Sequence, residues 1–158
     1  MNQLADRLAV LRAEGLAYGS MSGFGPLLWR GLESDPRVGG LLAAVHRADH
    51  EALERYALEL IGWGRGATPA GDDLLAGLGT VYPWLARAVA PLARGRTTAL
   101  GVELLDSVAM GAPPEPIADV VACRNASSLA QAARRLCAIG ASSGTDALVG
   151  IYAAMASQ

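Results

Sequence analysis

Two short segments of the sequence share the pattern Gly-x-Asp-x-Leu-x-Gly and carry most of its candidate chemistry. The first spans residues 71–77 and the second spans residues 144–150, so that 73 positions, about half of the 158-residue chain, separate them. Each segment follows a glycine-rich loop that carries hydroxyl side chains. The repetition predicts two similar loop-to-helix elements that face each other across one pocket.

The start of each of these two predicted helices is a candidate anion site. The first N–H groups of a helix have no helical partner, and the positive end of the helix dipole lies beside them. Glycine allows the backbone to approach a phosphate or carboxylate closely. The hydroxyl groups of Thr68, Ser142 and Ser143 add hydrogen-bond donors near the same two places.

Three aspartates in the first turns of these helices allow two interpretations. Asp72, Asp73 and Asp146 can cap the helices and offset their dipoles. They can also form a site for Mg²⁺, which binds oxygen ligands and is often held by one or two carboxylates together with substrate phosphate. A metal ion would reconcile three carboxylates with an anionic ligand. No cofactor is required by the sequence, and Mg²⁺ is left as an open possibility.

Other chemical patterns in the chain are weaker. His46 and His50 are four residues apart, but Asp49 between them is predicted to cap a new helix, which would place them on different elements. The glycine spacing of residues 62–66 is that of a dinucleotide-binding loop, yet no strand precedes it. The chain contains no lysine, which excludes a P-loop lysine and a Schiff-base lysine.

The elements that must position these residues are predicted to be helices. Apolar residues recur with a helical period, many of them Ala or Leu, and no alternating run indicates a strand. The predicted helices cover residues 2–14, 36–47, the segment that Asp49 caps, 72–82, 84–93, 98–110, 116–123, 128–139 and 145–156. We therefore expect an all-α fold, with residues 1–158 forming a single compact helical domain.

Composition narrows the functional classes further. The chain is 52% hydrophobic and 18% charged with a net charge of −2, which excludes disorder and gives no overall attraction for nucleic acid. No apolar run approaches the ~20 residues of a membrane span, and the N-terminus has no secretory pattern. We expect a cytoplasmic protein. Trp29, Trp63 and Trp84 are expected to be core or interface anchors.

The sequence resembles a known family in several motifs. Residues 64–77 resemble the Gly-x-Gly-Leu-Thr-Pro-Ser-Gly-Asp-Asp-(Phe/Leu)-Leu-x-Gly signature of the AllH-type family. Residues 139–150 resemble its Ile-Gly-His-Thr-Ser-Gly-x-Asp-x-Leu-x-Gly segment, and residues 96–98 and 109–111 resemble motifs that lie between the two. The order of these motifs and the spacing between them agree with those of the family over about residues 58–154. The chain is similar to a short form that lacks the N-terminal segment of longer members.

The resemblance implies a subunit of a carbamoyltransferase in allantoin and purine-nitrogen catabolism. Such a subunit works with two partner proteins to exchange a carbamoyl group between oxalurate or oxamate and phosphate. It implies that carbamoyl phosphate or a small carboxylate binds at the paired helix N-termini, and an oligomer is possible. The positions that match the family motifs are the candidate ligand-binding residues: Gly66, Thr68, Gly71, Asp72, Asp73, Thr98, Ser143, Gly144 and Asp146.

Two alternatives to this function stay open, and no catalytic residue is assigned. In the first, the chain is a non-catalytic anion-binding or scaffold subunit whose two loops pack the halves of the domain together. In the second, it is a Mg²⁺-dependent hydrolase in which Asp72, Asp73 and Asp146 hold the metal that activates water.

Overall fold

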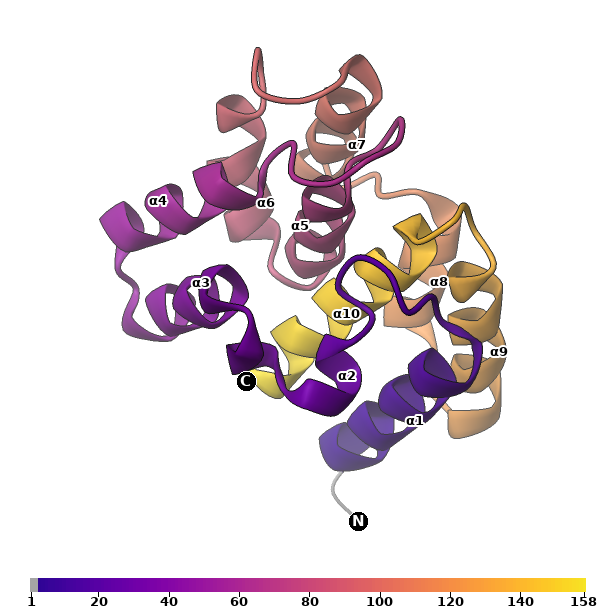
Figure 1. The fold of residues 1–158 in the computed structure, drawn as a ribbon. Coiled ribbons are helices and arrows are strands. Elements are labelled where there is room, and N and C mark those ends of the chain that lie inside the picture. The colour runs from indigo at the N-terminus through magenta and orange to yellow at the C-terminus, as the bar shows by residue number, and fades with distance from the viewer. Residues whose placement is uncertain (1–2) are drawn as a thin grey trace.

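The computed structural model describes residues 3–158, and these residues form ten α-helices and two short 3₁₀ helices with no strand among them (Figure 1). The predicted all-α fold is therefore confirmed. The α-helices are α1 (Gln3–Tyr18), α2 (Leu27–Arg30), α3 (Pro36–Arg47), α4 (His50–Leu60), α5 (Ala70–Val81), α6 (Pro83–Val89), α7 (Ala99–Ala109), α8 (Glu115–Ala122), α9 (Ala126–Cys137) and α10 (Ser143–Ala156). The 3₁₀ helices are η1 (Leu32–Ser34) and η2 (Ala90–Leu92).

Helices α5 and α10 form the centre of the molecule, and the other helices surround them (Figure 1). Residues 70–79 are all buried, which is the pattern of a helix enclosed on every side. Residues 144–151 of α10 are buried in the same way. The two Gly-x-Asp-x-Leu-x-Gly segments are therefore the first turns of the two central helices.

Glycines let α5 and α10 cross in close contact. A Cβ atom on Gly77 would overlap the carbonyl oxygen of Ala147, and a Cβ atom on Gly150 would overlap the carbonyl oxygen of Leu74. Positions 77 and 150 are equivalent in the repeated segment, and so are positions 74 and 147. The crossing is thus reciprocal, with each half of the repeat making the same contact to the other.

The helices that precede α5 and α10 repeat the same arrangement. Gly71 lies against the carbonyl group of Leu60 near the end of α4, and Gly144 lies against that of Leu136 near the end of α9. No room is left for a side chain at either glycine. The units α4–loop–α5 and α9–loop–α10 are therefore two structurally similar loop-to-helix elements, as the sequence predicts.

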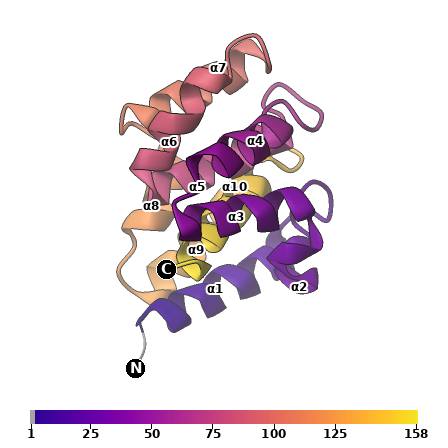
Figure 2. The same ribbon diagram turned by 90° about the vertical axis from the view of Figure 1, so that its left-hand side faces the viewer.

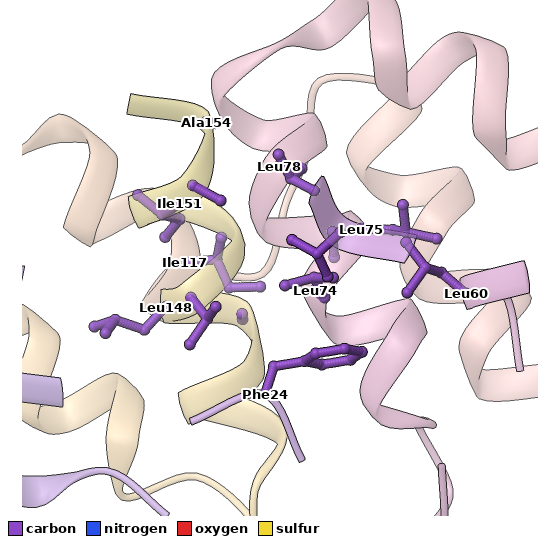
Figure 3. Packing of buried hydrophobic residues seen from close by; sticks show 14 of the residues in the cluster. Phe24, Leu60, Leu74, Leu75, Leu78, Ile117, Leu148, Ile151 and Ala154 are labelled. Atoms are coloured by element: carbon purple, nitrogen blue, oxygen red, sulfur yellow. The ribbon is translucent and has the colours of Figure 1, made fainter. Parts of the chain in front are cut away.

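Large aliphatic side chains fill the space around the central pair. Leu74, Leu78, Leu148 and Ile151 are completely buried. Figure 3 shows them among the side chains of this core, together with Phe24 from the N-terminal part of the chain. Burial of such side chains is the main stabilising contribution to a helical domain.

The structure corrects several sequence-based details. The first helix was expected over residues 2–14; residue 2 lies outside the described residues, and α1 continues to Tyr18 through Gly15, which packs tightly against Leu28 and Leu148. The three tryptophans are 37–50% exposed, so they are not core residues; that they anchor an interface, the other alternative, stays a prediction. Among the described residues, no helix has the length and apolar character needed to cross a membrane.

Candidate functional site

Three loops lie together on one side of the molecule, the side at the right of Figure 2. They are residues 19–26, residues 61–69 before α5, and residues 138–142 before α10. The Thr68 hydroxyl lies 3.1 Å from the Ser143 hydroxyl, which connects the second loop to the start of α10. The first loop is attached to the same helix, because Ser20 N–H donates to Thr145 Oγ1 at 2.9 Å. The predicted meeting of the two glycine-rich elements is confirmed.

Asp73 is the carboxyl group at the junction of the two elements. Its Oδ2 accepts a hydrogen bond from the Thr68 hydroxyl at 3.2 Å, and its side chain is almost completely buried. Burial raises the pKa of Asp73 from 3.8 to about 7; the hydroxyls of Ser143 and Thr68 oppose this rise, and the charges of Asp146 and Asp72 add to it. Near neutral pH both protonation states of Asp73 are populated, so this group can accept or donate a proton.

A cavity of about 190 Å³ opens beside Asp73. Its polar groups come from Thr68, Asp73 and Ser143, and they lie on the side formed by the two helix starts. The other walls are mainly apolar and include residues from four helices and the connections between them. They are Leu104, Pro114, Pro116, Ile117, Leu136, Ile139, Gly144 and Ala147. The cavity is therefore a small and mainly apolar space, with one buried titratable carboxyl group and two hydroxyls at its polar side.

Asp72 lies next to Asp73 in the sequence but has a different environment. It is fully buried; its Oδ1 accepts a hydrogen bond from Gly62 N–H at 2.8 Å, and its Oδ2 accepts one from the Thr97 hydroxyl. Burial raises the pKa of Asp72 above its usual value, while these two donors lower it. Asp72 thus fastens the loop before α5 to the segment before α7.

Asp146 holds the N-terminal loop in place. Its Oδ1 accepts a hydrogen bond from Phe24 N–H at 2.7 Å, and its Oδ2 is buried with no hydrogen-bond partner among the described residues. Burial raises the pKa of Asp146 to about 6, although Phe24 N–H and the nearby Ser142 hydroxyl favour the ionised form. Gly23, with φ +60°, lies directly over this carboxyl group and leaves no space for a side chain.

The backbone N–H groups at the two helix starts are partly occupied. Gly71 N–H donates to the carbonyl of Trp63 at 2.9 Å, and Gly144 N–H donates to that of Ile139 at 3.1 Å. Each loop therefore closes onto the first turn of the helix that follows it. The N–H groups expected to bind an anion at Gly71 and Gly144 are bonded to the protein itself in this structure.

Two further candidate residues lie away from the cavity walls. Thr98 caps α7: its hydroxyl accepts a hydrogen bond from Gly101 N–H at 3.0 Å and donates to the carbonyl of Ala67. Gly66 is exposed in the loop before α5 and adopts a φ of +102°, a conformation that favours glycine. Both residues shape the loop that carries Thr68.

The contribution of residues 19–26 was not expected from the sequence. This segment is visible as a Gly/Ser-rich loop, but nothing in its pattern shows that Phe24 and Ser20 donate backbone N–H groups to the start of α10. The apolar walls of the cavity were missed as well. Leu104 and Ile117 lie outside both repeated segments in the sequence, and their side chains have no chemical signature of a site.

The three aspartates are not grouped as metal ligands. No set of three or more His, Cys, Asp or Glu side chains within residues 3–158 lies close enough to hold a metal ion. Asp72 and Asp146 accept hydrogen bonds from different loops. His46 and His50 lie on α3 and α4, and Asp49 caps α4 by accepting a hydrogen bond from Ala52 N–H at 3.0 Å, as predicted.

Comparison with models of known protein families assigns the chain to one family. The model of one family, described as oxamate carbamoyltransferase subunit AllH, matches residues 60–155, which contain α5, all but the last residue of α10, Thr68 and the residues that line the cavity. Comparisons with curated proteins and with solved structures give no match. The match covers more than half of the chain and includes both repeated segments. The chain therefore belongs to the AllH family of oxamate carbamoyltransferase subunits.

Proposed function

We propose that this chain acts in a carbamoyltransferase of oxamate or oxalurate and that the cavity beside Asp73 holds the small metabolite of that reaction. The metabolite is carbamoyl phosphate or a small carboxylate such as oxamate. Family membership supports the reaction class, and the position of the cavity between the two motif helices supports the place of binding. The pathway we propose is the catabolism of allantoin and purine nitrogen.

The observation that carries this proposal is the carboxyl group of Asp73 on the wall of the cavity, with a pKa of about 7. A group that titrates near neutral pH is well suited to transfer protons. When oxalurate gives its carbamoyl group to phosphate, a phosphate oxygen bonds to the carbamoyl carbon and the bond from that carbon to the oxamate nitrogen breaks. That nitrogen must take up a proton, which Asp73 supplies and then recovers from the phosphate.

The two hydroxyl groups beside Asp73 fit the same role. Thr68 donates to Asp73 Oδ2, and the Ser143 hydroxyl lies 3.1 Å from that of Thr68. This chain of hydroxyls holds the carboxyl group at the cavity and favours its ionised form. Thr68 and Ser143 are therefore proposed as positioning residues for Asp73.

The electrostatics of the site place a condition on the binding of an anion. No arginine or histidine among the described residues forms an ion pair with Asp72, Asp73 or Asp146. Ionised carboxylates repel an anion, so carbamoyl phosphate or oxamate should bind more tightly as the pH falls below the pKa of Asp73.

We further propose that the activity needs partner subunits. Ile139 lines the cavity and is 42% exposed, so that the cavity reaches the surface at an apolar residue. A partner subunit seated there would exclude water and complete the site. For Asp72 and Asp146 we propose a structural role, because the carboxyl group of each accepts a hydrogen bond from a loop of this same chain.

The proposal is tested with the full chain, first alone and then mixed with candidate partner subunits. We expect carbamoyl phosphate or oxamate to raise its melting temperature by ligand linkage, and more at pH ~6 than at pH ~8. The mixture should form carbamoyl phosphate from oxalurate and phosphate. Asp73→Asn should abolish this activity, whereas Asp106→Asn on the surface of α7 should retain it. The proposed function is refuted if the two ligands do not stabilise the chain and no partner subunit supports carbamoyl transfer.

A further inference from the structure

We infer that residues 19–26 form a strap over Asp146 that is closed while this carboxyl group is protonated and opens when it ionises. The strap is the segment between α1 and α2, and it contains no acidic or basic side chain of its own. Its opening exposes the start of α10, the helix that also supplies Ser143 to the cavity wall. The inference concerns the folded chain alone and does not depend on the proposed reaction.

Two hydrogen bonds attach the strap to the first turn of α10. Ser20 N–H donates to Thr145 Oγ1 at 2.9 Å, and Phe24 N–H donates to Asp146 Oδ1 at 2.7 Å. The residues between these two attachments, 21–23, are exposed. Both acceptors are side-chain oxygens, so both bonds can break while the backbone hydrogen bonds of α10 stay intact. A change in the charge of Asp146 acts directly on one of the two attachments.

The second oxygen of Asp146 makes the closed strap unfavourable for a charge. Asp146 Oδ2 is completely buried and has no hydrogen-bond partner among the described residues. Gly23 covers the group, since a Cβ atom at this position would overlap both carboxyl oxygens. A buried carboxylate needs several donors to replace the water that it loses, whereas a neutral carboxyl group leaves a much smaller cost unmet. The closed strap therefore fits the protonated form.

No cation compensates a negative charge at Asp146, which forms no ion pair within residues 3–158. Arg37 lies near the strap, with its guanidinium carbon 5.7 Å from the ring centroid of Phe24, but it is paired with Asp35 at 2.6 Å. The arginines on the helices that pack against α10 donate to backbone carbonyls or pair with other acids. They are Arg7, Arg12, Arg134 and Arg135.

The acidic and thiol groups on the same helices do not favour ionisation of Asp146 either. The charge of Asp73 on α5 interacts unfavourably with that of Asp146, and Asp72 beside it is also buried. Cys137 on α9 is neutral near pH 7, because burial raises its pKa further above 9.0. The remaining titratable groups on these helices are exposed or paired with arginine: Asp6, Glu14, Tyr18, Glu115 and Asp119.

The closed strap binds the proton of Asp146 more tightly than the open strap. Burial raises the pKa of Asp146 to about 6 in the closed structure, against its usual value of 3.8 in water. Closure is therefore most favourable below about pH 4 and is weakened as the pH rises to about 6. A difference of about two pKa units changes the equilibrium between the closed and the open strap by ~100-fold.

Hydrogen exchange measured by NMR on the full chain tests the strap. Between about pH 4 and pH 7 the protection of the Phe24 amide, the factor by which structure slows its exchange, should fall by ~100-fold. Strap opening exposes little surface, so this exchange should not respond to dilute urea, whereas that of the buried Ile151 amide in α10 should follow global unfolding. Constant protection of Phe24, or exchange that follows Ile151 in both pH and urea, would overturn the inference.

Two variants assign the pH dependence to one carboxyl group. Asp146→Asn keeps an oxygen acceptor for Phe24 N–H and cannot ionise, so the protection of the Phe24 amide should become independent of pH. Asp73→Asn changes the equivalent position of the other repeat and should retain the ~100-fold fall. A fall that persists in Asp146→Asn, or one that disappears in Asp73→Asn, contradicts the inference.

A direct titration of the unsubstituted chain keeps the test independent of how the variants fold. The ¹³C shift of the Asp146 carboxyl carbon should titrate with a midpoint near pH 6, and the ¹⁵N shift of the Phe24 amide should change with the same midpoint. An Asp146 midpoint below about pH 5 would refute the strap, because a carboxyl group that ionises in its usual range does not couple its proton to closure.

Discussion

Gly77 and Gly150 are equivalent residues of two crossing helices, and each lies against the carbonyl group of the residue that follows the motif aspartate of the other helix. Gly77 faces Ala147, and Gly150 faces Leu74. This reciprocal contact fixes how closely α5 and α10 approach, and thereby the separation of Asp73 and Asp146. The glycines far from the loops therefore help to set the geometry of the cavity.

Substitution of either crossing glycine should destabilise the protein. Alanine normally stabilises a helix relative to glycine by ~0.5–1 kcal/mol. At positions 77 and 150 the added Cβ would overlap a carbonyl oxygen, so Gly77→Ala and Gly150→Ala should each lower the free energy of unfolding by ~1–3 kcal/mol. Urea denaturation measures this effect, with Ser127→Ala on the exposed side of α9 as a control that should be neutral or slightly stabilising.

The double variant tests the reciprocity of the crossing. Once one alanine has moved the helices apart, the second should cost less, so the combined loss of Gly77→Ala and Gly150→Ala should be smaller than the sum of the two single losses. Strictly additive losses in urea denaturation would show that the two contacts are independent and would contradict the reciprocal packing.

Removal of the Asp72 carboxyl group should detach the loop before α5 from α7. Asp72→Ala leaves the N–H of Gly62 and the hydroxyl of Thr97 without their acceptor, which should cost ~1–3 kcal/mol of stability. Thr97→Val, which removes one donor and keeps the shape, should cost less. Thermal unfolding of both variants gives the comparison, and an unchanged melting temperature in Asp72→Ala would show that this carboxyl group does not hold the loop.

The buried carboxyl groups predict an unusual dependence of stability on pH. The pKa of Asp73 is about 7 and that of Asp146 about 6, both raised from 3.8, so the folded chain binds these protons more tightly than the unfolded chain. Their stabilising contribution is complete below about pH 4 and is lost as the pH rises to about 7. The lowered pKa values of Glu14 and Asp35 act in the opposite direction, but only below about pH 5.

The measurement is the urea midpoint as a function of pH. It should fall between about pH 5 and pH 8, by an amount on the order of a few kcal/mol in the free energy of unfolding. Asp73→Asn should flatten the part of the curve near pH 7, since its side chain does not titrate. A midpoint that stays level or rises over this range in the parent chain is the outcome that contradicts the prediction.

Gly23 should be needed to keep the N-terminal loop on Asp146. Gly23→Ala introduces both an unfavourable positive φ and an overlap with the Asp146 carboxyl group. Gly95→Ala is a matched control, because Gly95 also has a positive φ, +75°, while its added Cβ would meet nothing. The strain at positive φ lowers the free energy of unfolding by ~1–2 kcal/mol in either variant. Any larger decrease in Gly23→Ala is therefore caused by the overlap with the carboxyl group. Hydrogen exchange at the Phe24 amide should accelerate in Gly23→Ala and stay slow in Gly95→Ala.

Much of the fold could be predicted from the sequence. The helical period, the cap at Asp49 and the repeated Gly-x-Asp-x-Leu-x-Gly segments are local signals, and the structure contains the corresponding elements. Thr98 was expected inside a helix and instead caps α7. The meeting of the two loops was also predictable, because the repetition itself indicates a paired arrangement. The start of α5 was expected at Asp72 and lies at Ala70, since Pro69 at the N-cap leads directly into the helix.

The different roles of the three aspartates could not be predicted from the sequence. Asp72, Asp73 and Asp146 look alike in the sequence, yet their partners differ. Each of them has one partner from a distant part of the chain: Thr97 for Asp72, Ser143 for Asp73 and Phe24 for Asp146. Periodicity does not encode such long-range contacts. The tryptophans show the same limit: Trp63 is 41% exposed, and the guanidinium carbon of Arg37 lies 4.2 Å from its ring centroid, a contact that the sequence does not reveal.

The hydrogen bond from Phe24 to Asp146 bears on where this protein can be cut. The family match begins at residue 60, but the segment that shields the start of α10 comes from residues 19–26, and α1 packs against α9 and α10. A fragment trimmed to the family boundaries would open a buried acidic side chain to water and uncover two helices. We therefore expect the segment that folds on its own to extend beyond the family match, and expressed fragments should retain α1 to α4 together with the matched region.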